Sequence, residues 1–312
     1  MGTGFVTREE RTLVHTRRLT WIFGSSRSGS TWLLEMLGEL SGVVAIDDPH
    51  LGHHLGVWRP IPLAWGACED PPELATLLDL KAEEDGFFFA ERYRDAWWEP
   101  LRELIAARFE AQARDSGLDP GEARFVIKEP GSQVAPLLVD LFPDSKLIFL
   151  LRDGRDVIDS WLDAYSRGSW ALPGGAFPVD PEGRPALIRW LAAVWAYRSR
   201  AVRSAFERQR PEDRLLIRYE DLRRQPEHCL ARACALLGLD PAPVAAIAER
   251  HRFERIPDGA RGSRCRARQA ATGGWRENLT AEEQAVMHEA LGSSLSEFGY
   301  DEVTAPALSA TA

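Results

Sequence analysis

A glycine- and serine-rich segment near the N-terminus has the residue types that bind phosphate groups. Gly24-Ser-Ser-Arg-Ser-Gly-Ser-Thr31 lies between a short apolar run, 19–23, and a helical pattern that begins at Trp32. Backbone N–H groups at a helix start, with glycines that let an anion approach closely, form a phosphate site. The spacing matches the nucleotide-triphosphatase loop, but Ser30 stands at the lysine position of that pattern. The positive charge lies within the loop instead, at Arg27.

A second pattern for anion binding follows a later apolar run. Arg152 comes directly after the run 146–151, and Ser160 follows eight residues later on a predicted helix. A guanidinium group gives charge-assisted hydrogen bonds to a phosphate, and a hydroxyl near a helix start adds a neutral donor. Either motif alone could be ordinary structure, a helix-capping turn in the first case and a charged surface in the second. The presence of both in one chain favours the binding function.

These residues depend on strands that bring them to one place. Apolar runs predict five short buried strands, at 19–23, 43–46, 124–128, 146–151 and 214–219. Helical periodicity predicts helices at about 32–40, 73–81, 97–114, 134–141, 153–165, 187–209, 227–237, 244–250 and 281–291. Strands that alternate with helices predict an α/β fold, a central parallel sheet with helices on both faces.

The segments without periodicity set the limits of this domain. We expect a polar leader at 1–18, a single domain over 19–302 and a disordered tail at 303–312. The stretches 49–72 and 172–185 are rich in Pro and Gly and are expected to be irregular. Residues 258–274 are rich in Gly, Arg and Ala, which is typical of a mobile surface segment.

Composition narrows the class of protein. The chain has 312 residues with a formal net charge of −9, which argues against a general nucleic-acid binder. Its four cysteines have neither a metal-site spacing nor a disulfide framework, which fits a reducing cytoplasm. The N-terminus lacks the apolar core of a signal peptide, and no apolar run reaches the roughly 18 residues of a membrane span. We therefore expect a soluble cytoplasmic protein, whose oligomeric state the sequence leaves open.

The two anion motifs resemble those of sulfotransferases that use 3′-phosphoadenosine 5′-phosphosulfate (PAPS). Arg-Ser-Gly-Ser-Thr after a first strand is similar to the 5′-phosphosulfate loop of the membrane-bound and many bacterial members, and cytosolic members carry Lys in place of Arg27. The resemblance implies a P-loop-like sulfotransferase fold. It also implies that Arg27 contacts the bridging phosphate–sulfate oxygen and that Ser28, Gly29, Ser30, Thr31 and Trp32 surround the 5′-phosphate. Arg152 and Ser160 would bind the 3′-phosphate.

Two further stretches extend the resemblance to about residues 19–276. Arg268-Gln-Ala-Ala-Thr-Gly-Gly-Trp-Arg276 is similar to a late family motif, with Arg268 at the position of an arginine that binds the 3′-phosphate. Several residues of that motif differ here, and a solvated charge run is the alternative. Tyr219 lies in a Tyr-Glu-Asp stretch that family members place near the nucleotide, although a core tyrosine explains it as well.

The chemistry of sulfuryl transfer also needs a cation and a base. Lys128 ends a predicted parallel strand, at the edge where ligands bind, and the resemblance places it near the transferring sulfate. Cytosolic relatives carry a catalytic His where this chain has Pro130. Other branches use a carboxylate about 21 residues beyond the basic residue of the loop, which is Asp48 here. Asp48 is therefore the first candidate for the general base, followed by Glu129 and His50.

The expected reaction moves a sulfuryl group from PAPS to an acceptor hydroxyl or amine and releases 3′,5′-ADP. It requires no metal, and the partner is a small-molecule, glycan or lipid acceptor rather than a nucleic acid. Two alternatives stay open. One is a small-molecule kinase on a similar fold, which Ser30 at the lysine position disfavours. The other is a nucleotide-binding protein without catalytic activity.

Overall fold

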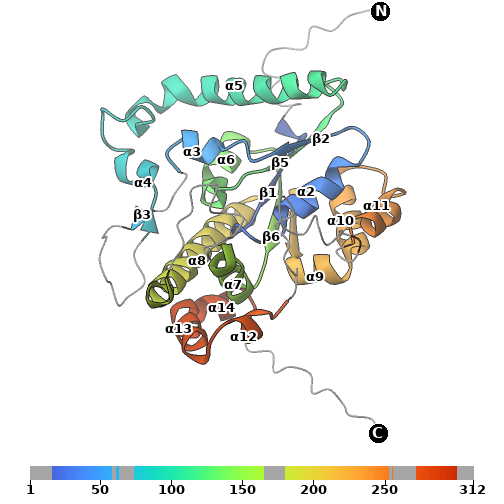
Figure 1. The fold of residues 1–312 in the computed structure, drawn as a ribbon. Helices are drawn as coiled ribbons and strands as arrows, with labels where there is room; N and C mark the ends of the chain where they lie inside the picture. The colour runs from blue at the N-terminus through green and yellow to red at the C-terminus, as the bar shows by residue number, and fades with distance from the viewer. Residues whose placement is uncertain are drawn as a thin grey trace, which may run out of the picture.

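Five parallel strands form the sheet at the centre of the molecule (Figure 1). The computed structural model describes residues 16–57, 61–62, 74–164, 180–252, 255 and 272–300. The strands lie in the order β2-β5-β1-β6-β7. Their bounds are β1 Leu19–Phe23, β2 Val43–Asp47, β5 Arg124–Lys128, β6 Lys146–Leu151 and β7 Arg214–Arg218. Because β1 lies between β5 and β6, the segments that follow these three strands meet at the carboxyl edge of the sheet.

The strands β1, β5 and β6 are buried on both faces, which explains why most of their residues are apolar. Successive side chains of a strand point to opposite faces. In β1, Trp21 and Phe23 belong to one hydrophobic cluster, whereas Ile22 belongs to a second cluster on the other face. The strand β5 divides its side chains between the two clusters in the same way.

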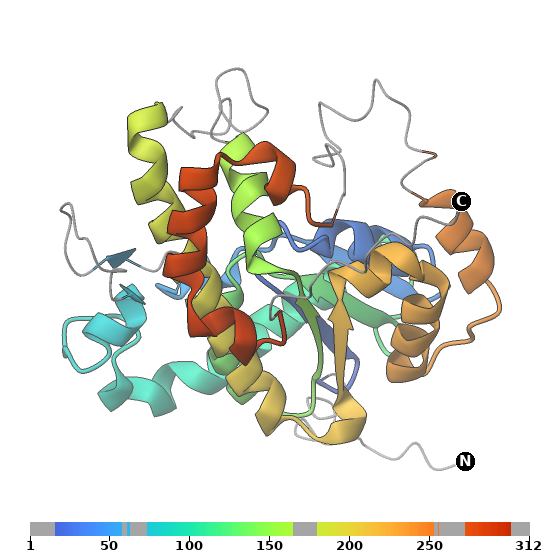
Figure 2. The same cartoon turned by 90° about the horizontal axis from the view of Figure 1, so that it is seen from below.

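Helices cover both faces of the sheet, as Figures 1 and 2 show. The first cluster is covered by α5 Arg94–Asp115, α6 Ala135–Leu141, α7 Gly154–Ala164, α8 Arg184–Arg208, α12 Trp275–Asn278, α13 Ala281–Leu291 and α14 Ser293–Glu297. The second cluster is covered by α2 Ser30–Gly38, α9 Tyr219–Arg224, α10 Pro226–Leu237 and α11 Val244–Arg250. The predicted α/β fold class is therefore confirmed.

Short elements complete the described part of the chain. Between β2 and α5 lie α3 Leu51–His54, β3 Ile61–Pro62, β4 Leu74–Ala75, α4 Leu77–Lys81 and the 3₁₀ turn η1 Glu91–Tyr93. Three further 3₁₀ turns are η2 Ser132–Val134, η4 Pro181–Gly183 and η5 Pro211–Asp213. The strands β3 and β4 form a separate antiparallel pair. No helix within the described ranges is both long and apolar enough to cross a membrane.

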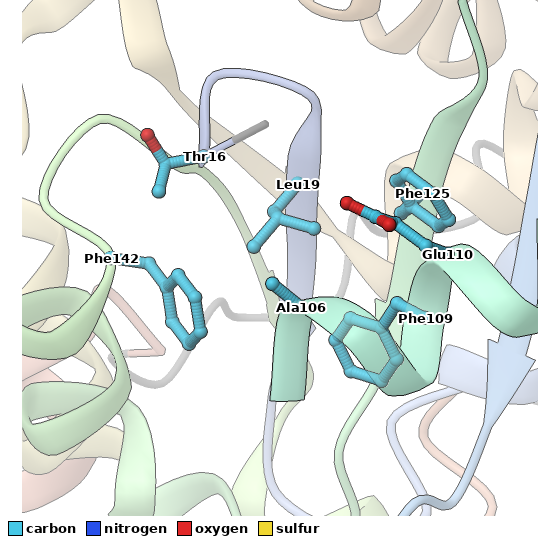
Figure 3. Close-up of a pocket in the computed structure, with 7 residues that line it drawn as sticks. All are labelled: Thr16, Leu19, Ala106, Phe109, Glu110, Phe125 and Phe142. Carbon is cyan, nitrogen blue, oxygen red and sulfur yellow. The ribbon is translucent and has the colours of Figure 1, made fainter. Parts of the chain in front are cut away.

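The amino edge of the sheet is closed by aromatic packing. The side chains of Phe109 on α5, Phe142 and Leu19 face a cavity of about 10 Å³ (Figure 3). Trp21 packs against both phenylalanine rings, with ring centroids about 6 Å apart. A space of this size barely holds one water molecule. The aromatic packing therefore leaves almost no internal space at this edge.

The structure departs from the sequence predictions mainly where short elements interrupt the irregular segments. The helix expected at 97–114 begins three residues earlier, at Arg94, and continues through Pro100. Residues 51–54, expected to be irregular, form α3. The last predicted strand ends at Arg218, so that Tyr219 is the first residue of α9 instead. The expected leader and tail, and most of 172–185 and 258–274, lie outside the described residues.

Candidate active site

The segment after β1, residues 24–31, forms a tight turn that we call the phosphate loop. Ser28 N donates a hydrogen bond to Ser25 O at 3.1 Å. The backbone is left-handed at Arg27 and at Gly29, with φ angles of 74° and 87°. Turns that pass through this region direct successive N–H groups into one concave surface, which binds anions. A Cβ atom on Gly29 would lie 2.7 Å from the Tyr219 ring, so only glycine fits there.

The Ser28 hydroxyl lies inside this turn. The residue is 0% exposed, and its Oγ has no hydrogen-bond partner within the described part of the chain. Buried hydroxyl groups are nearly always hydrogen-bonded in folded proteins. The orphaned Oγ is therefore a hydrogen-bonding group inside the loop whose partner is not among the described residues.

The second anion motif lies directly against the phosphate loop. Arg27 Nε donates a hydrogen bond to Ser160 Oγ on α7 at 2.9 Å. In the opposite direction, Arg152 Nη1 donates to the Arg27 carbonyl oxygen at 2.7 Å. The two motifs are more than 120 residues apart in sequence, yet they form one continuous surface. The order β1-β6 in the sheet explains this, because each motif follows the carboxyl end of one of these adjacent strands.

Tyr219 fills the space beneath both motifs. The Arg152 guanidinium lies 4.2 Å from the centre of the Tyr219 ring, within the range of a cation–π interaction. The same ring contacts the position where a Gly29 side chain would be. Burial raises the pKa of the Tyr219 hydroxyl, with a smaller opposite effect from the Arg152 charge. Tyr219 therefore supports Arg152 and the loop together.

Lys128 forms a second group of contacts at the end of β5. Its Nζ donates to Thr31 Oγ1 at 2.9 Å and to Asp47 Oδ1 at 2.7 Å. It also lies 3.0 Å from Asp48 Oδ1. Thr31 and Asp47 thus accept two of the three N–H donors of the ammonium group, and Asp48 Oδ1 lies within ion-pair distance without a hydrogen bond. The Thr31 contact joins this carboxylate–lysine group to the phosphate loop.

Glu129 points away from this group and toward α3. Its carboxylate accepts hydrogen bonds from Leu51 N at 3.0 Å and from Gly52 N at 3.3 Å. Burial raises the pKa of Glu129 to about 7, although these N–H groups act in the opposite direction. The bonds hold the turn before α3, in which Asp48 and His50 have left-handed backbones with φ angles of 49° and 56°. Glu129 thus fixes the turn that carries the other two base candidates.

The remaining predicted contacts are only partly described. Trp32 Nε1 donates to the His251 carbonyl oxygen at 2.9 Å, so Trp32 binds the end of α11. Arg268 lies outside the described residues. After that gap, Gly273 N donates to both carboxylate oxygens of Asp156 on α7, at 3.0 and 2.9 Å. The described residues before this gap thus contact α2, through His251, and the first described residues after it contact α7, through Gly273.

The comparisons with known proteins agree with this geometry. The profile of the Sulfotransferase family matches residues 20–243, more than half of the chain. The chain belongs to the sulfotransferase family. None of the curated protein sequences compared with it matches significantly.

Solved structures show the same fold at low sequence identity. Mouse sulfotransferase SULT7A1, complexed with PAP, superposes with a TM-score of 0.52 and 14% identity, covering 90% of this chain and 85% of that one. Sulfotransferase STF9 from Mycobacterium avium gives 0.52 and 16%, covering 94% and 80%. The sulfotransferase domain from the curacin biosynthetic pathway gives 0.50 and 18%, covering 90% and 97%.

Sequence reasoning did not identify three residues that contact the site of this sulfotransferase. Asp47 shares the Lys128 ammonium group with Asp48. Asp156 binds Gly273, and burial raises its pKa to about 6. Arg198 on α8 donates to Ser26 Oγ in the phosphate loop at 2.9 Å. The signal for Arg198 was available, because it follows Leu191 and Val194 on the apolar stripe of its helix, where a charge is unusual.

Proposed function

We propose that this sulfotransferase transfers the sulfuryl group of PAPS to an acceptor hydroxyl or amine. The observation that carries the proposal is the direct contact between the two anion motifs through Arg27, Arg152 and Ser160. A nucleotide with phosphate groups at both its 5′ and 3′ positions is the class of ligand that such a joined surface fits. The mouse relative complexed with PAP supports the same ligand class.

The residues of the phosphate loop fit the 5′-phosphosulfate end of that nucleotide. The left-handed Arg27 and Gly29 form the concave backbone surface, and the buried Ser28 Oγ supplies a hydroxyl without another partner among the described residues. Ser30 and Thr31 begin α2, so their N–H groups point out of its first turn. Positive helix ends and oriented N–H groups stabilise a bound anion.

The two arginines have separate roles in this proposal. When bound, PAPS supplies the sulfuryl group, which passes to the acceptor by in-line displacement as 3′,5′-ADP leaves. Arg27 places a permanent positive charge where negative charge develops on the leaving oxygen, and such preorganised charge lowers the barrier. Arg152 and Ser160 bind the 3′-phosphate, to which the guanidinium contributes charge-assisted hydrogen bonds. Arg268 is assigned to the same phosphate from the family resemblance.

We assign the general base to Asp48. Both carboxylate oxygens of Glu129 are held by backbone N–H groups, and that residue is 2% exposed, so it has no path to an acceptor. The Asp48 side chain is 29% exposed and lies beside Lys128. Lys128 in turn bonds Thr31 of the phosphate loop, which supports a role for Asp48 beside the sulfuryl group. His50 is the residue that caps the N-terminus of α3.

Steady-state kinetics with PAPS and a panel of acceptors tests the proposal. Arg27→Ala should lower kcat by about 100- to 1,000-fold, the loss typical of removing one group that stabilises developing charge. Arg152→Ala should instead raise the Kd of 3′,5′-ADP by about 10- to 100-fold, as expected for a charged hydrogen bond. Arg92→Ala is the control, because Arg92 is exposed and pairs with the exposed Asp85, far along the chain from both motifs.

A ligand comparison separates this function from phosphoryl transfer. The thermal unfolding temperature should rise with 3′,5′-ADP and change little with ATP, since Ser30 provides no cation for a γ-phosphate. Protection by ATP alone would indicate a kinase. Protection by 3′,5′-ADP without any acceptor-dependent turnover would indicate a nucleotide-binding protein. Unchanged kinetics in both arginine variants would remove the site assignment.

A further inference from the structure

Arg198 contacts the phosphate loop from a direction that neither anion motif uses. It lies on α8, and its Nη1 donates to Ser26 Oγ at 2.9 Å. Its Nε donates to Gln133 Oε1 in η2, the turn after β5, at 3.0 Å. Arg152 and Ser160 reach the loop from the segment after β6. The loop is therefore contacted from two sides, by Arg198 together with the turn after β5 and by the segment after β6.

The contact of Arg198 with the loop matters because the backbone of the loop is strained at Arg27. A residue with a side chain is strained in the left-handed region, where its Cβ lies too close to the backbone carbonyl oxygen. Such a conformation persists only where its surroundings fix it. Ser132 Oγ bonds the Gly24 carbonyl oxygen and Arg198 bonds Ser26, so the residues before Arg27 are held. Arg152 holds the carbonyl oxygen of Arg27 itself.

Gln133 connects the same arginine to the segment that carries the base candidate. Gln133 is 5% exposed, and its Nε2 donates to the Val57 carbonyl oxygen at 2.6 Å. Val57 N bonds Gly52 O at 2.7 Å, and Gly52 N bonds Glu129. Glu129 fixes the turn of Asp48, as described above. A chain of hydrogen bonds thus runs from the loop, through Arg198, to that turn.

We propose that Arg198 is a positioning residue for sulfuryl transfer, which fixes the position of the phosphate loop relative to the Asp48 turn. This inference rests on the proposed function. Arginine suits the position because its planar group directs two N–H donors to two fixed acceptors, Ser26 Oγ and Gln133 Oε1. Lysine has a single charged nitrogen on a flexible chain and cannot reproduce that geometry.

The test compares Arg198→Met with Arg208→Met on the same helix. Arg208 pairs with Asp140 on the surface at the C-terminal end of α8, so it controls for the loss of one arginine. Arg198→Met should lower kcat at saturating PAPS and acceptor by about 10- to 100-fold, because small misplacements of reacting groups cost this much. The Kd of 3′,5′-ADP should rise only about threefold or less, since Arg152 and Ser160 still provide charged and neutral hydrogen bonds.

Two further single variants and one double variant test whether the effect depends on the contact between Arg198 and Ser26. Ser26→Ala removes one acceptor and should lower kcat by about 3- to 10-fold, and Arg198→Lys should recover only part of the methionine variant's loss. The double variant Ser26→Ala with Arg198→Met should be no slower than Arg198→Met alone, because the hydroxyl acts through the arginine. Additive losses would contradict this coupling.

The outcomes separate this inference from the function on which it rests. Titration with 3′,5′-ADP counts the competent sites, so kcat is expressed per folded site. A purely structural role would lower the unfolding temperature and leave that kcat unchanged, which would overturn the positioning role alone. Absence of turnover in the wild type with PAPS and every acceptor would overturn the proposed function instead.

Discussion

The buried carboxyl group of Glu129 should make this sulfotransferase less stable against unfolding as the pH rises. Burial raises its pKa from 4.5 to about 7, and the N–H groups of Leu51, Gly52 and Gly131 oppose that rise. The folded chain therefore holds this proton more tightly than the unfolded chain. The contribution to stability is fully present below the unfolded pKa of 4.5 and is lost as the pH rises through about 7.

The perturbation that isolates this effect is Glu129→Gln, which removes the titrating group and keeps its size. One pKa unit corresponds to about 1.4 kcal/mol, so the wild type should lose about 3 kcal/mol of unfolding free energy relative to the variant between about pH 4.5 and pH 7.5. At low pH the wild type should be the more stable, because Gln keeps one carbonyl acceptor but also presents an NH₂ group to neighbouring N–H donors.

Urea unfolding followed by tryptophan fluorescence at a series of pH values measures this difference. Subtracting the variant's curve from that of the wild type removes the contribution of other groups, such as Asp156, whose pKa burial raises to about 6. Glu83→Gln, at an exposed position, controls for the loss of one negative charge. If the stability curves of wild type and Glu129→Gln run parallel across this range, or diverge in the opposite direction, the burial argument is refuted.

Two more predictions concern the loop and the base. Gly29→Ala should lower the unfolding free energy by about 1 to 3 kcal/mol and weaken 3′,5′-ADP binding, since φ is 87° and the new Cβ would lie 2.7 Å from the Tyr219 ring; an equally stable variant in urea unfolding would contradict this packing. Asp48→Asn should lower kcat by about 100- to 10,000-fold without changing the Kd of 3′,5′-ADP. Asp47→Asn is its matched control, and equal losses in both would show that Asp48 is not the base.

Much of the fold could be predicted because the elements that build it repeat a simple pattern. Each central strand is buried on both faces, so it appears as an uninterrupted apolar run, and the long helices show regular periodicity. The short helix α3 could not be predicted in this way. Its first N–H groups are bound by Glu129, which lies 78 residues away from Leu51 in sequence. A tertiary contact, rather than local propensity, determines that element.

The candidate site was predictable wherever its chemistry demands a residue type at a fixed spacing. The phosphate loop and the Arg152–Ser160 motif are of this kind, since phosphate groups need N–H groups, a guanidinium and hydroxyls near strand ends. The structure adds that the motifs touch through Arg27, which spacing within either motif cannot reveal. Sequence reasoning also ranked Glu129 as a base, because the burial of its carboxylate becomes visible only when α3 binds the residue that follows β5.

The residues that sequence reasoning missed contact other residues of the candidate site. Arg198 and Asp47 each bind a residue that the motifs had already singled out, in or beside the phosphate loop. Such partners have no fixed spacing to the motif. A donor to Ser26 could come from any of several turns of α8, and either of the two aspartates at the end of β2 could bind Lys128. What selects them is the tertiary structure, namely where α8 packs on the sheet and where the edge strand β2 ends. At Arg198 a sequence signal does exist, because a charged residue on an otherwise apolar helix stripe needs polar partners, and the structure supplies Ser26 and Gln133.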